Sequence, residues 1–306
     1  MTLAILCSGQ GAQHPGMFDL TADLPEAQAV FAAAGPLLGA DPRDLARAGG
    51  AALNGNRTGQ ILCCVAALAA WTIVSAAAPR RRIVAGYSIG DLAAWGCAGR
   101  FSVETVLALA AARAEAMDAA SGSGHGLAGI RGLPQARIAD LARAGGCHLA
   151  IRNAPDSVVV GGAVEALESV CRDALAAGAQ RAVVLPVHTP SHTPLLADAA
   201  LRFGETLRAA PRATPPRTGL RLVGGLDGAA VFDAEAGLDK LSRQIAQTID
   251  WAACLDACRE YGATTILELG PGHALATMAS AAIPGARVRA LEDFRSAAGA
   301  RAWLAG

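Results

Sequence analysis

Three segments of this chain share one pattern of apolar and polar positions: a short apolar run, then glycines, then apolar residues at helical spacing. They are LAILCSGQGAQ (residues 3–13), IVAGYSIGDLAAW (83–95) and TTILELGPGHAL (264–275). A short continuous apolar run is typical of a strand covered on both faces, and repeated strand, turn and helix units predict a parallel sheet with helices on its faces. Because such sheets bind ligands at the carboxyl ends of their strands, we expect the three turns to meet at one site.

The middle of the chain follows a different pattern. Apolar runs predict strands at 126–132, 147–153, 157–162 and 181–187, and helical spacing predicts helices at 134–145 and 163–178. This β-α-β-β-α-β order is that of a ferredoxin-like unit. We therefore predict an α/β protein in which a parallel-sheet large domain (1–121 and 189–306) carries an inserted ferredoxin-like small domain (122–188).

The longest apolar run, ILCCVAALAAWTIVSAAA (61–78), reaches the minimum length for a membrane span. It is rich in alanine, which is nearly neutral in transfer to lipid, and Gln60 and Arg80 bound it closely. Hydrophobic residues make up 53% of the 306 residues but aromatic residues only 4%, which favours a helix-rich globular chain. We predict a buried helix and no membrane contact. The start of the chain lacks the charged region of a secretory signal, so we expect a cytoplasmic protein.

Charge and cysteine usage argue against two further classes. The formal net charge is zero and no basic stripe is interleaved with aromatic residues, so a nucleic-acid partner is not expected. The eight cysteines show no paired zinc spacing: Cys63 and Cys64 are adjacent, and Cys254 and Cys258 lack a histidine at ligand spacing. We predict no metal site, and free buried thiols in a reducing compartment.

The spacing Gly86-x-Ser88-x-Gly90 is the nucleophile-elbow pattern. In an elbow, a sharp turn from strand to helix holds the serine in a strained conformation, and the flanking glycines let backbone pass close by. The hydroxyl would project at a helix N-terminus, where N–H groups and the helix dipole favour developing negative charge. The strand and helix predicted on either side favour catalysis over a chance spacing, so Ser88 is a candidate nucleophile for acyl transfer.

A serine hydroxyl is a weak nucleophile and needs a base within hydrogen-bond reach, usually a histidine. Two alternatives remain open. The base is His192 in TPSHTPLL, where Pro190 restricts the backbone and, since no acid is evident nearby, a backbone carbonyl would be the partner of the ring. Alternatively it is His273 in a triad of Ser88, Asp250 and His273, which has the chain order of α/β-hydrolases and would make the protein a serine esterase.

Arg113 is a further candidate for a functional residue. It lies at the border of the apolar stripe of a helix predicted over 102–118. The stripe contains Val103, Val106, Leu107, Ala110, Ala114 and Met117. A partly buried guanidinium is costly unless a carboxylate or phosphate meets it, and its planar fork binds a carboxylate with two hydrogen bonds. Arg113 therefore binds an acidic substrate, pairs with an acid of the chain, or extends its stem to solvent.

Together these segments closely resemble the malonyl-CoA:acyl-carrier-protein transacylases, including the acyltransferase domains of fatty acid and polyketide synthases. The resemblance runs over nearly the whole chain, through SGQGAQHPGM, GYSIGDLAAW, ARAEAM, IRNAPDSVVVGG, TPSHTPLL, QIAQTIDW and LELGPGHAL. Each motif alone is modest, but their order and spacing together are highly specific. The resemblance implies a hydrolase-like parallel-sheet large domain with an inserted ferredoxin-like small domain.

The resemblance also implies an activity. A malonyl group would move from malonyl-CoA, through a malonyl-serine ester, to the phosphopantetheine-type thiol of an acyl carrier protein, with coenzyme A as product and no bound cofactor or metal. The implied roles are nucleophile for Ser88, base for His192, base-orienting carbonyl for Gln244, oxyanion-hole N–H donors for Gln10 and Ile89, carboxylate ligand for Arg113, and a place near the site for Asn153.

The chain departs from the family pattern at a few positions. Cys7 and Ser8 stand where most relatives have Phe-Pro, Tyr87 replaces a histidine, Asp91 replaces a glutamate, and Thr248 replaces a proline. The variants CSGQGAQ and GYSIGDLAAWG look most like the malonyltransferase (epsilon) subunit of biotin-independent malonate decarboxylase. That likeness implies the carrier subunit of malonate decarboxylase as partner, with other subunits of that complex as further partners. A malonyltransferase of fatty acid or polyketide synthesis is the alternative.

Overall fold

A parallel sheet lies at the centre of the larger part of the molecule. The computed structural model describes residues 1–212 and 219–306. In spatial order the strands are β10 (Arg287–Ala290), β9 (Thr265–Leu269), β1 (Leu3–Cys7), β2 (Arg82–Gly86) and β7 (Leu220–Leu222), and each runs parallel to its neighbours. The three strands predicted from the sequence are therefore the neighbours β9, β1 and β2. The turns that follow them end at one edge of the sheet.

Successive residues of β1 point to opposite faces of the sheet. Leu3, Ile5 and Cys7 belong to one hydrophobic cluster, whereas Ala4 and Leu6 belong to another, and all five are fully buried. This is the pattern of a strand covered on both faces, which the sequence predicted. All eight cysteines are buried and free, as predicted.

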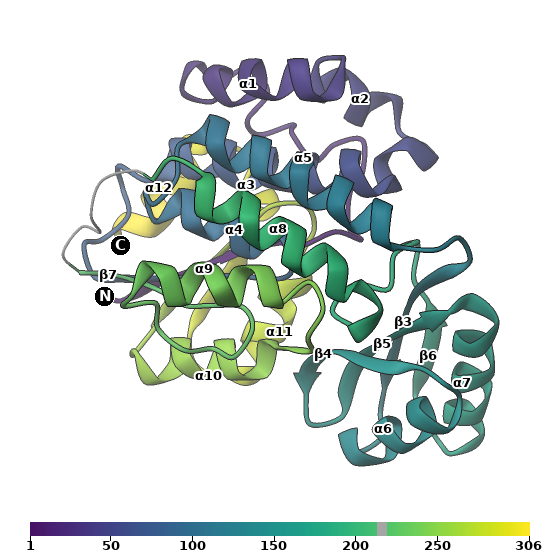
Figure 1. The fold of residues 1–306 in the computed structure, drawn as a ribbon. Helices are drawn as coiled ribbons and strands as arrows, with labels where there is room; N and C mark the ends of the chain where they lie inside the picture. The colour runs from purple at the N-terminus through teal and green to yellow at the C-terminus, as the bar shows by residue number, and fades with distance from the viewer. Residues whose placement is uncertain (213–218) are drawn as a thin grey trace.

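Helices cover both faces of this sheet (Figure 1). The face that includes Leu3 belongs to a hydrophobic cluster that also contains residues of α1 (Gln28–Leu38), α2 (Pro42–Ala48), α3 (Asn56–Val74), α4 (Ile89–Cys97), α5 (Val103–Ala120), α8 (Ala197–Ala209), α9 (Ala234–Arg243) and α12 (Ala297–Ala305). Within it, α1 packs on α3 and α5 and not on the sheet. The opposite face packs with α10 (Trp251–Glu260) and α11 (Ala274–Ala282). Single 3₁₀ turns lie at Pro25–Ala27, Ala51–Asn54, Pro194–Leu196 and Leu291–Asp293. This arrangement of helices, sheet and helices confirms the α/β class.

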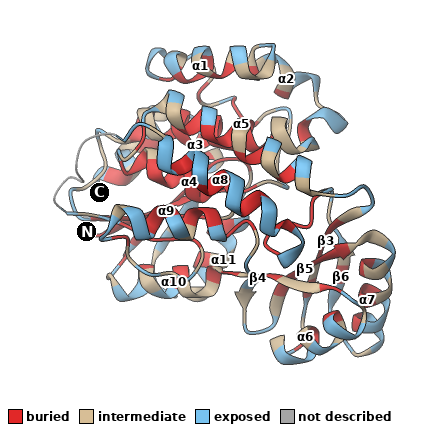
Figure 2. Cartoon of the chain, viewed as in Figure 1, coloured by how far each residue is buried: buried red, intermediate tan, exposed pale blue. Residues whose placement is uncertain are grey.

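The helix α3 contains most of the long apolar run. Among the described residues it is the one helix long and apolar enough to cross a membrane, but 78% of its most apolar 18-residue window is buried inside the protein. Figure 2 shows α3 and the neighbouring α4 as largely buried segments. The prediction of a buried helix is confirmed, since α3 packs in the core rather than presenting a free apolar surface.

A second sheet lies at one end of the molecule, with α6 (Gln135–Ala144) and α7 (Val164–Ala176) packed against it (Figure 1). In spatial order its strands are β6 (Arg181–Val184), β3 (His125–Arg131), β5 (Ser157–Ala163), β4 (His148–Ala154) and β8 (Ile249–Asp250). The first four are antiparallel and, with the two helices, follow the predicted β-α-β-β-α-β order. The unexpected strand is β8, which pairs in parallel with β4 from beyond the predicted small domain. The domain boundaries at 122 and 188 stay a prediction.

Candidate active site

Ser88 lies in the turn between β2 and α4, with φ 56° and ψ −120°. The two flanking glycines make this turn possible. A Cβ on Gly86 would lie 2.0 Å from the carbonyl oxygen of Gly90, and a Cβ on Gly90 would lie 2.1 Å from the carbonyl oxygen of Cys7. Only glycine fits at either position, because no side chain tolerates backbone at such distances. The turn is thereby packed tightly against the end of β1.

Replacing Gly90 with alanine is expected to lower the free energy of unfolding by at least about 1–3 kcal/mol, because the new methyl group overlaps backbone of β1. Urea denaturation measures the change. The matched control is Gly35→Ala: Gly35 lies inside α1, and the nearest atom to an added Cβ is the carbonyl oxygen of Ala40 at 4.0 Å. Alanine fits there and favours the helix. Equal stability of Gly90→Ala and the unaltered protein would show that the turn tolerates a side chain.

His192 reaches Ser88 from a loop 104 residues further along the chain, and its Nε2 lies 2.8 Å from Ser88 Oγ. Among the described residues other than glycine, only Ser88 (φ 56°) and His192 (φ 64°) have a positive φ. Such strain gathers at functional sites, where surrounding contacts hold it. Here the backbone N–H of His192 donates to the backbone carbonyl of Ile245 at 2.8 Å. The fold thus brings the side chains of these two residues with strained backbone into contact with each other.

The second ring nitrogen of His192 contacts the backbone of Gln244, with 2.5 Å between Nδ1 and the carbonyl oxygen. A carbonyl can only accept, so Nδ1 carries the ring proton and Nε2 is left to accept the proton of the Ser88 hydroxyl. Gln244 is the C-cap of α9. Carbonyls at a helix C-terminus lack intrahelical partners and carry partial negative charge, which favours an imidazolium. This carbonyl occupies the place of the acid in a Ser-His-Asp triad.

His192 is neutral in this setting. Its side chain is almost fully buried, and burial, followed by the positive charge of Arg113, lowers the pKa of the imidazole to about 3. The hydrogen bond to Gln244 acts in the opposite direction. A neutral imidazole with a free Nε2 lone pair is able to take a proton from Ser88.

Arg113, on α5, is only 1% exposed. Its Nη1 donates to Gln60 Oε1 at 2.7 Å, and the Gln60 amide in turn donates to Asn56 Oδ1 at 2.7 Å. Its Nε and Nη2 are buried and have no hydrogen-bond partner among the described residues. Burial lowers the pKa of Arg113 to about 10, which leaves it charged at neutral pH. A buried guanidinium with one unpaired edge is suited to bind a carboxylate.

Two further predicted residues, Ile89 and Gln10, lie in segments that adjoin Ser88. Ile89 is the first residue of α4, so its N–H lies outside the helical hydrogen-bond ladder. Gln10 follows Gly9 in the turn after β1, and a Cβ on Gly9 would lie 2.7 Å from the Tyr87 carbonyl oxygen and 3.5 Å from Ser88 Cβ. The turn that carries Gln10 therefore lies directly against the nucleophile elbow.

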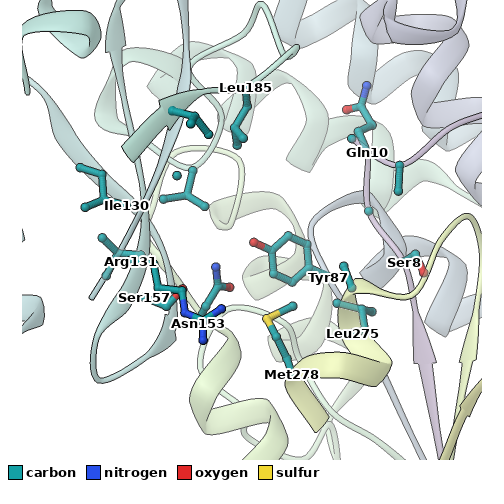
Figure 3. A pocket seen from close by; sticks show the side chains of 18 of the residues that line it. Ser8, Gln10, Tyr87, Ile130, Arg131, Asn153, Ser157, Leu185, Leu275 and Met278 are labelled. Atoms are coloured by element: carbon teal, nitrogen blue, oxygen red, sulfur yellow. The ribbon is translucent and has the colours of Figure 1, made fainter. Parts of the chain in front are cut away.

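A cavity of about 340 Å³ lies beside the elbow, with walls from both sheets (Figure 3). The Tyr87 hydroxyl points toward the Asn153 side chain among the residues that line it (Figure 3). Burial raises the pKa of Tyr87, and a hydrogen bond with the Asn153 side chain partly offsets this rise. The exposed Arg131 and Arg181 also line the cavity, as does Gln10. The cavity thus runs from two exposed cations to residues that adjoin the elbow, while the predicted nucleophile, base and buried arginine do not line it.

A model of the acyl transferase domain matches residues 5–279 of the chain. The chain belongs to this acyl transferase family. A malonyl CoA-acyl carrier protein transacylase from Salmonella typhimurium is 30% identical over 280 residues, which are 89% of this chain and 90% of that protein.

Solved structures are similar to this acyl transferase over almost its whole length. The crystal structure of an acyl-carrier-protein S-malonyltransferase from Burkholderia pseudomallei has a TM-score of 0.90 at 30% identity, and the match covers 99% of this chain and 100% of that one. A malonyl-transacylase in complex with a type II PKS acyl-carrier protein also has a TM-score of 0.90, at 28% identity, over 99% of both chains. These likenesses confirm the predicted α/β fold.

The alternative triad is wrong for this acyl transferase. Asp250 caps α10 by accepting from the Ala253 N–H at 3.0 Å, and its other oxygen lies 3.7 Å from Arg152. The side chain of His273 is 53% exposed, with Nδ1 3.2 Å from Asp293. Ser88 instead contacts His192. Chain order alone suggested the triad, but the fold directs Asp250 and His273 to different partners.

Sequence reasoning missed two buried residues of this acyl transferase. Gln60 was only a boundary of the apolar run, yet it is fully buried and bonds Arg113. The sequence did contain an indication of this: Gln60 lies at helical spacing from apolar residues of α3, which places its polar side chain on a buried face of that helix. Asp91 was noted as a departure from the family pattern, without a role, yet it accepts from the Gln244 side chain at 3.0 Å. Its partner lies 153 positions away, so no local pattern indicates the contact.

Proposed function

We propose that this acyl transferase moves a malonyl group from malonyl-CoA to the phosphopantetheine-type thiol of an acyl carrier protein, through a malonyl ester on Ser88. The observation that carries the proposal is the 2.8 Å contact between Ser88 Oγ and His192 Nε2, in a site that also holds a buried Arg113 with two unpaired nitrogens. The names of the similar proteins support it, and one of them was solved with a carrier protein. The reaction needs no bound cofactor or metal.

In the first half-reaction, Ser88 Oγ attacks the thioester carbonyl carbon while His192 Nε2 takes the hydroxyl proton. Negative charge develops on the carbonyl oxygen, where the N–H groups of Gln10 and Ile89 would stabilise it. The carbon–sulfur bond then breaks, and the imidazolium gives its proton to the leaving sulfur. Coenzyme A leaves as a thiol, and Ser88 remains as its malonyl ester.

The second half-reaction reverses these steps with a new thiol. His192 Nε2 takes the proton of the carrier thiol as its sulfur attacks the ester carbonyl. The bond to Ser88 Oγ breaks, and the proton passes from the imidazolium to this oxygen. The carrier leaves with the malonyl thioester, and free Ser88 is restored.

Arg113 is proposed to hold the free carboxylate of the malonyl group. Its unpaired Nε and Nη2 can donate two hydrogen bonds to one carboxylate. Pairing would also neutralise the positive charge that lowers the pKa of His192. The carboxylate of a bound malonyl group would therefore raise the pKa of His192 and make it a stronger base. An acetyl group has no carboxylate and lacks this effect.

The cavity beside the elbow is proposed to hold the pantetheine arm that both thioesters share. Asn153 Oδ1 is buried without a hydrogen-bond partner among the described residues, so it can accept from an amide N–H of that arm. Arg131 and Arg181 can attract phosphate at its far end.

We further propose that the carrier is the carrier subunit of malonate decarboxylase, rather than one of fatty acid or polyketide synthesis. The support is the set of departures from the common family motifs at Ser8, Tyr87 and Asp91, which resemble the malonyltransferase subunit of that complex. Two of these residues, Ser8 and Tyr87, line the cavity proposed to receive the carrier arm.

Mass spectrometry after mixing with malonyl-CoA tests the proposed function. We expect one malonyl adduct, mapped to Ser88, that disappears when a holo carrier protein is added and is absent from Ser88→Ala. Acetyl-CoA is the control donor. Offering the two kinds of carrier separately tests the partner, and preferential discharge to a fatty acid carrier would contradict the malonate decarboxylase assignment. A chain that gains no adduct would be a binding subunit instead of an enzyme.

A further inference from the structure

The helix α4 carries Ser88 at its N-cap and Asp91 one turn later. Asp91 is buried, with 1% of its surface exposed. Its Oδ2 accepts from the Gln244 side-chain amide at 3.0 Å and from the Gly225 N–H at 2.8 Å. Gly225 must be glycine for this approach, because a Cβ there would lie 2.9 Å from the same oxygen. The carboxylate is thus held between α4 and two segments that follow β7.

Gln244 connects this carboxylate to the base. It is fully buried, and its backbone carbonyl accepts from His192 Nδ1, while the next carbonyl, of Ile245, accepts from the His192 N–H. Its side-chain Nε2 donates to Asp91, whereas its Oε1 is buried without a partner among the described residues. Among the described residues, the hydrogen bond to Asp91 is therefore the polar interaction that holds the Gln244 side chain in place.

These contacts form a closed ring. It runs from Ser88 along α4 to Asp91, through the Gln244 side chain to the Gln244 carbonyl, and through His192 back to Ser88 Oγ. We propose that Asp91 is a positioning residue that fixes the distance between nucleophile and base by holding Gln244 against the helix that carries Ser88. The inference rests on the proposed function, because it assigns Asp91 to the acylation of Ser88.

Physical reasons favour positioning over a contribution to stability. Removing a carboxylate from water without an opposite charge in direct contact is costly, and burial raises the pKa of Asp91 to about 7. Its Oδ1 is buried without a hydrogen-bond partner among the described residues, which adds to that cost. What Asp91 supplies is one oxygen that orders two donors at the site. A misplacement of about 1 Å there can cost on the order of 10²-fold in rate.

The test measures single-turnover malonylation of Ser88 in Asp91→Ala, Asp91→Asn, Gln244→Leu and the double variant Asp91→Ala/Gln244→Leu. We expect Asp91→Ala to slow acylation by about 10²-fold, with little change in KM for malonyl-CoA. Asp91→Asn should recover a large part of the loss, since one amide oxygen can accept from both donors. The double variant should be no slower than the slower single variant, because both remove one interaction.

Asp233→Ala is the matched control. Asp233 caps the N-terminus of α9 by accepting from the Ala236 N–H at 2.7 Å, so its loss destabilises the same helix without touching the ring of contacts. It should lower the melting temperature while leaving the acylation rate nearly unchanged. The NMR signal of the His192 Nδ1 proton should shift in Asp91→Ala and stay in Asp233→Ala, which a merely structural role of Asp91 does not predict.

Two results would overturn the inference while leaving the proposed function intact: unaltered acylation in Asp91→Ala, or strictly additive losses in the double variant. Absence of any malonyl adduct on the unaltered protein would instead remove the proposed function itself. The unaltered protein, assayed first, separates these outcomes.

Discussion

Replacing His192 with alanine is expected to slow malonylation of Ser88 by roughly 10²- to 10⁴-fold, the usual contribution of a positioned general base. Among the described residues, the side-chain hydrogen bond of Ser88 is to His192: Nε2 lies 2.8 Å from Ser88 Oγ, and the Gln244 carbonyl holds the opposite nitrogen. Without the imidazole, the proton of the serine hydroxyl has no acceptor at the moment of attack. The rate of adduct formation, followed by quenching and mass spectrometry, measures the loss.

The matched control for that prediction is His273→Ala. His273 is also a histidine outside regular secondary structure, in a glycine-rich turn, but its ring pairs with Asp293 at the surface instead of with Ser88. Its replacement should leave adduct formation nearly unchanged. The assignment of the base would be refuted if both variants lost activity equally, or if His273→Ala lost the more. Circular dichroism of both variants shows whether either has failed to fold.

Replacing Arg113 with alanine is expected to reduce malonyl transfer by tens- to thousands-fold, corresponding to about 2–5 kcal/mol for one partner of a buried, hydrogen-bonded charge pair. Acetyl transfer should change far less, because an acetyl group offers no carboxylate to the guanidinium. Arg113 lowers the pKa of His192, so removing its charge raises the basicity of the imidazole and gives no reason for a general loss. Specificity, measured as the ratio of kcat/KM for the two donors, is therefore the quantity to compare.

The contact between Arg113 and Gln60 determines which control is needed. Gln60 accepts from Nη1, so Arg113→Ala also leaves a buried amide oxygen without its donor. Arg113→Met, which keeps an unbranched side chain without the charge, separates loss of charge from loss of packing. Both variants should discriminate poorly between donors. Equal losses with malonyl-CoA and acetyl-CoA would show that Arg113 supports the fold of the site and does not select the acyl group.

Much of the architecture was readable in the sequence because it depends on local patterns. The apolar runs before Ser8 and Tyr87 became β1 and β2, and Gly86 and Gly90 proved necessary for the turn between β2 and α4. The two-residue strand β8 could not be read in this way, since two residues carry no alternation. It forms only because the chain at Ile249 meets the edge of β4.

The sequence by itself determined three neighbouring strands of the large sheet, the β-α-β-β-α-β order of the small domain and the strained turn at Ser88. Backbone propensity and the hydrophobic period act between residues a few positions apart, so local patterns suffice for these features. The residue patterns left two histidines as candidates for the base, and the contact between His192 and Ser88 in the tertiary structure decided between them. Only the tertiary structure showed how deeply Arg113 is buried and that Asp91 and Gln244 contact each other. Ser88 and His192 lie 104 positions apart in the sequence, and Asp91 and Gln244 lie 153 positions apart. The selection of these contacts depends on how the two sheets and their helices pack, which no local pattern records.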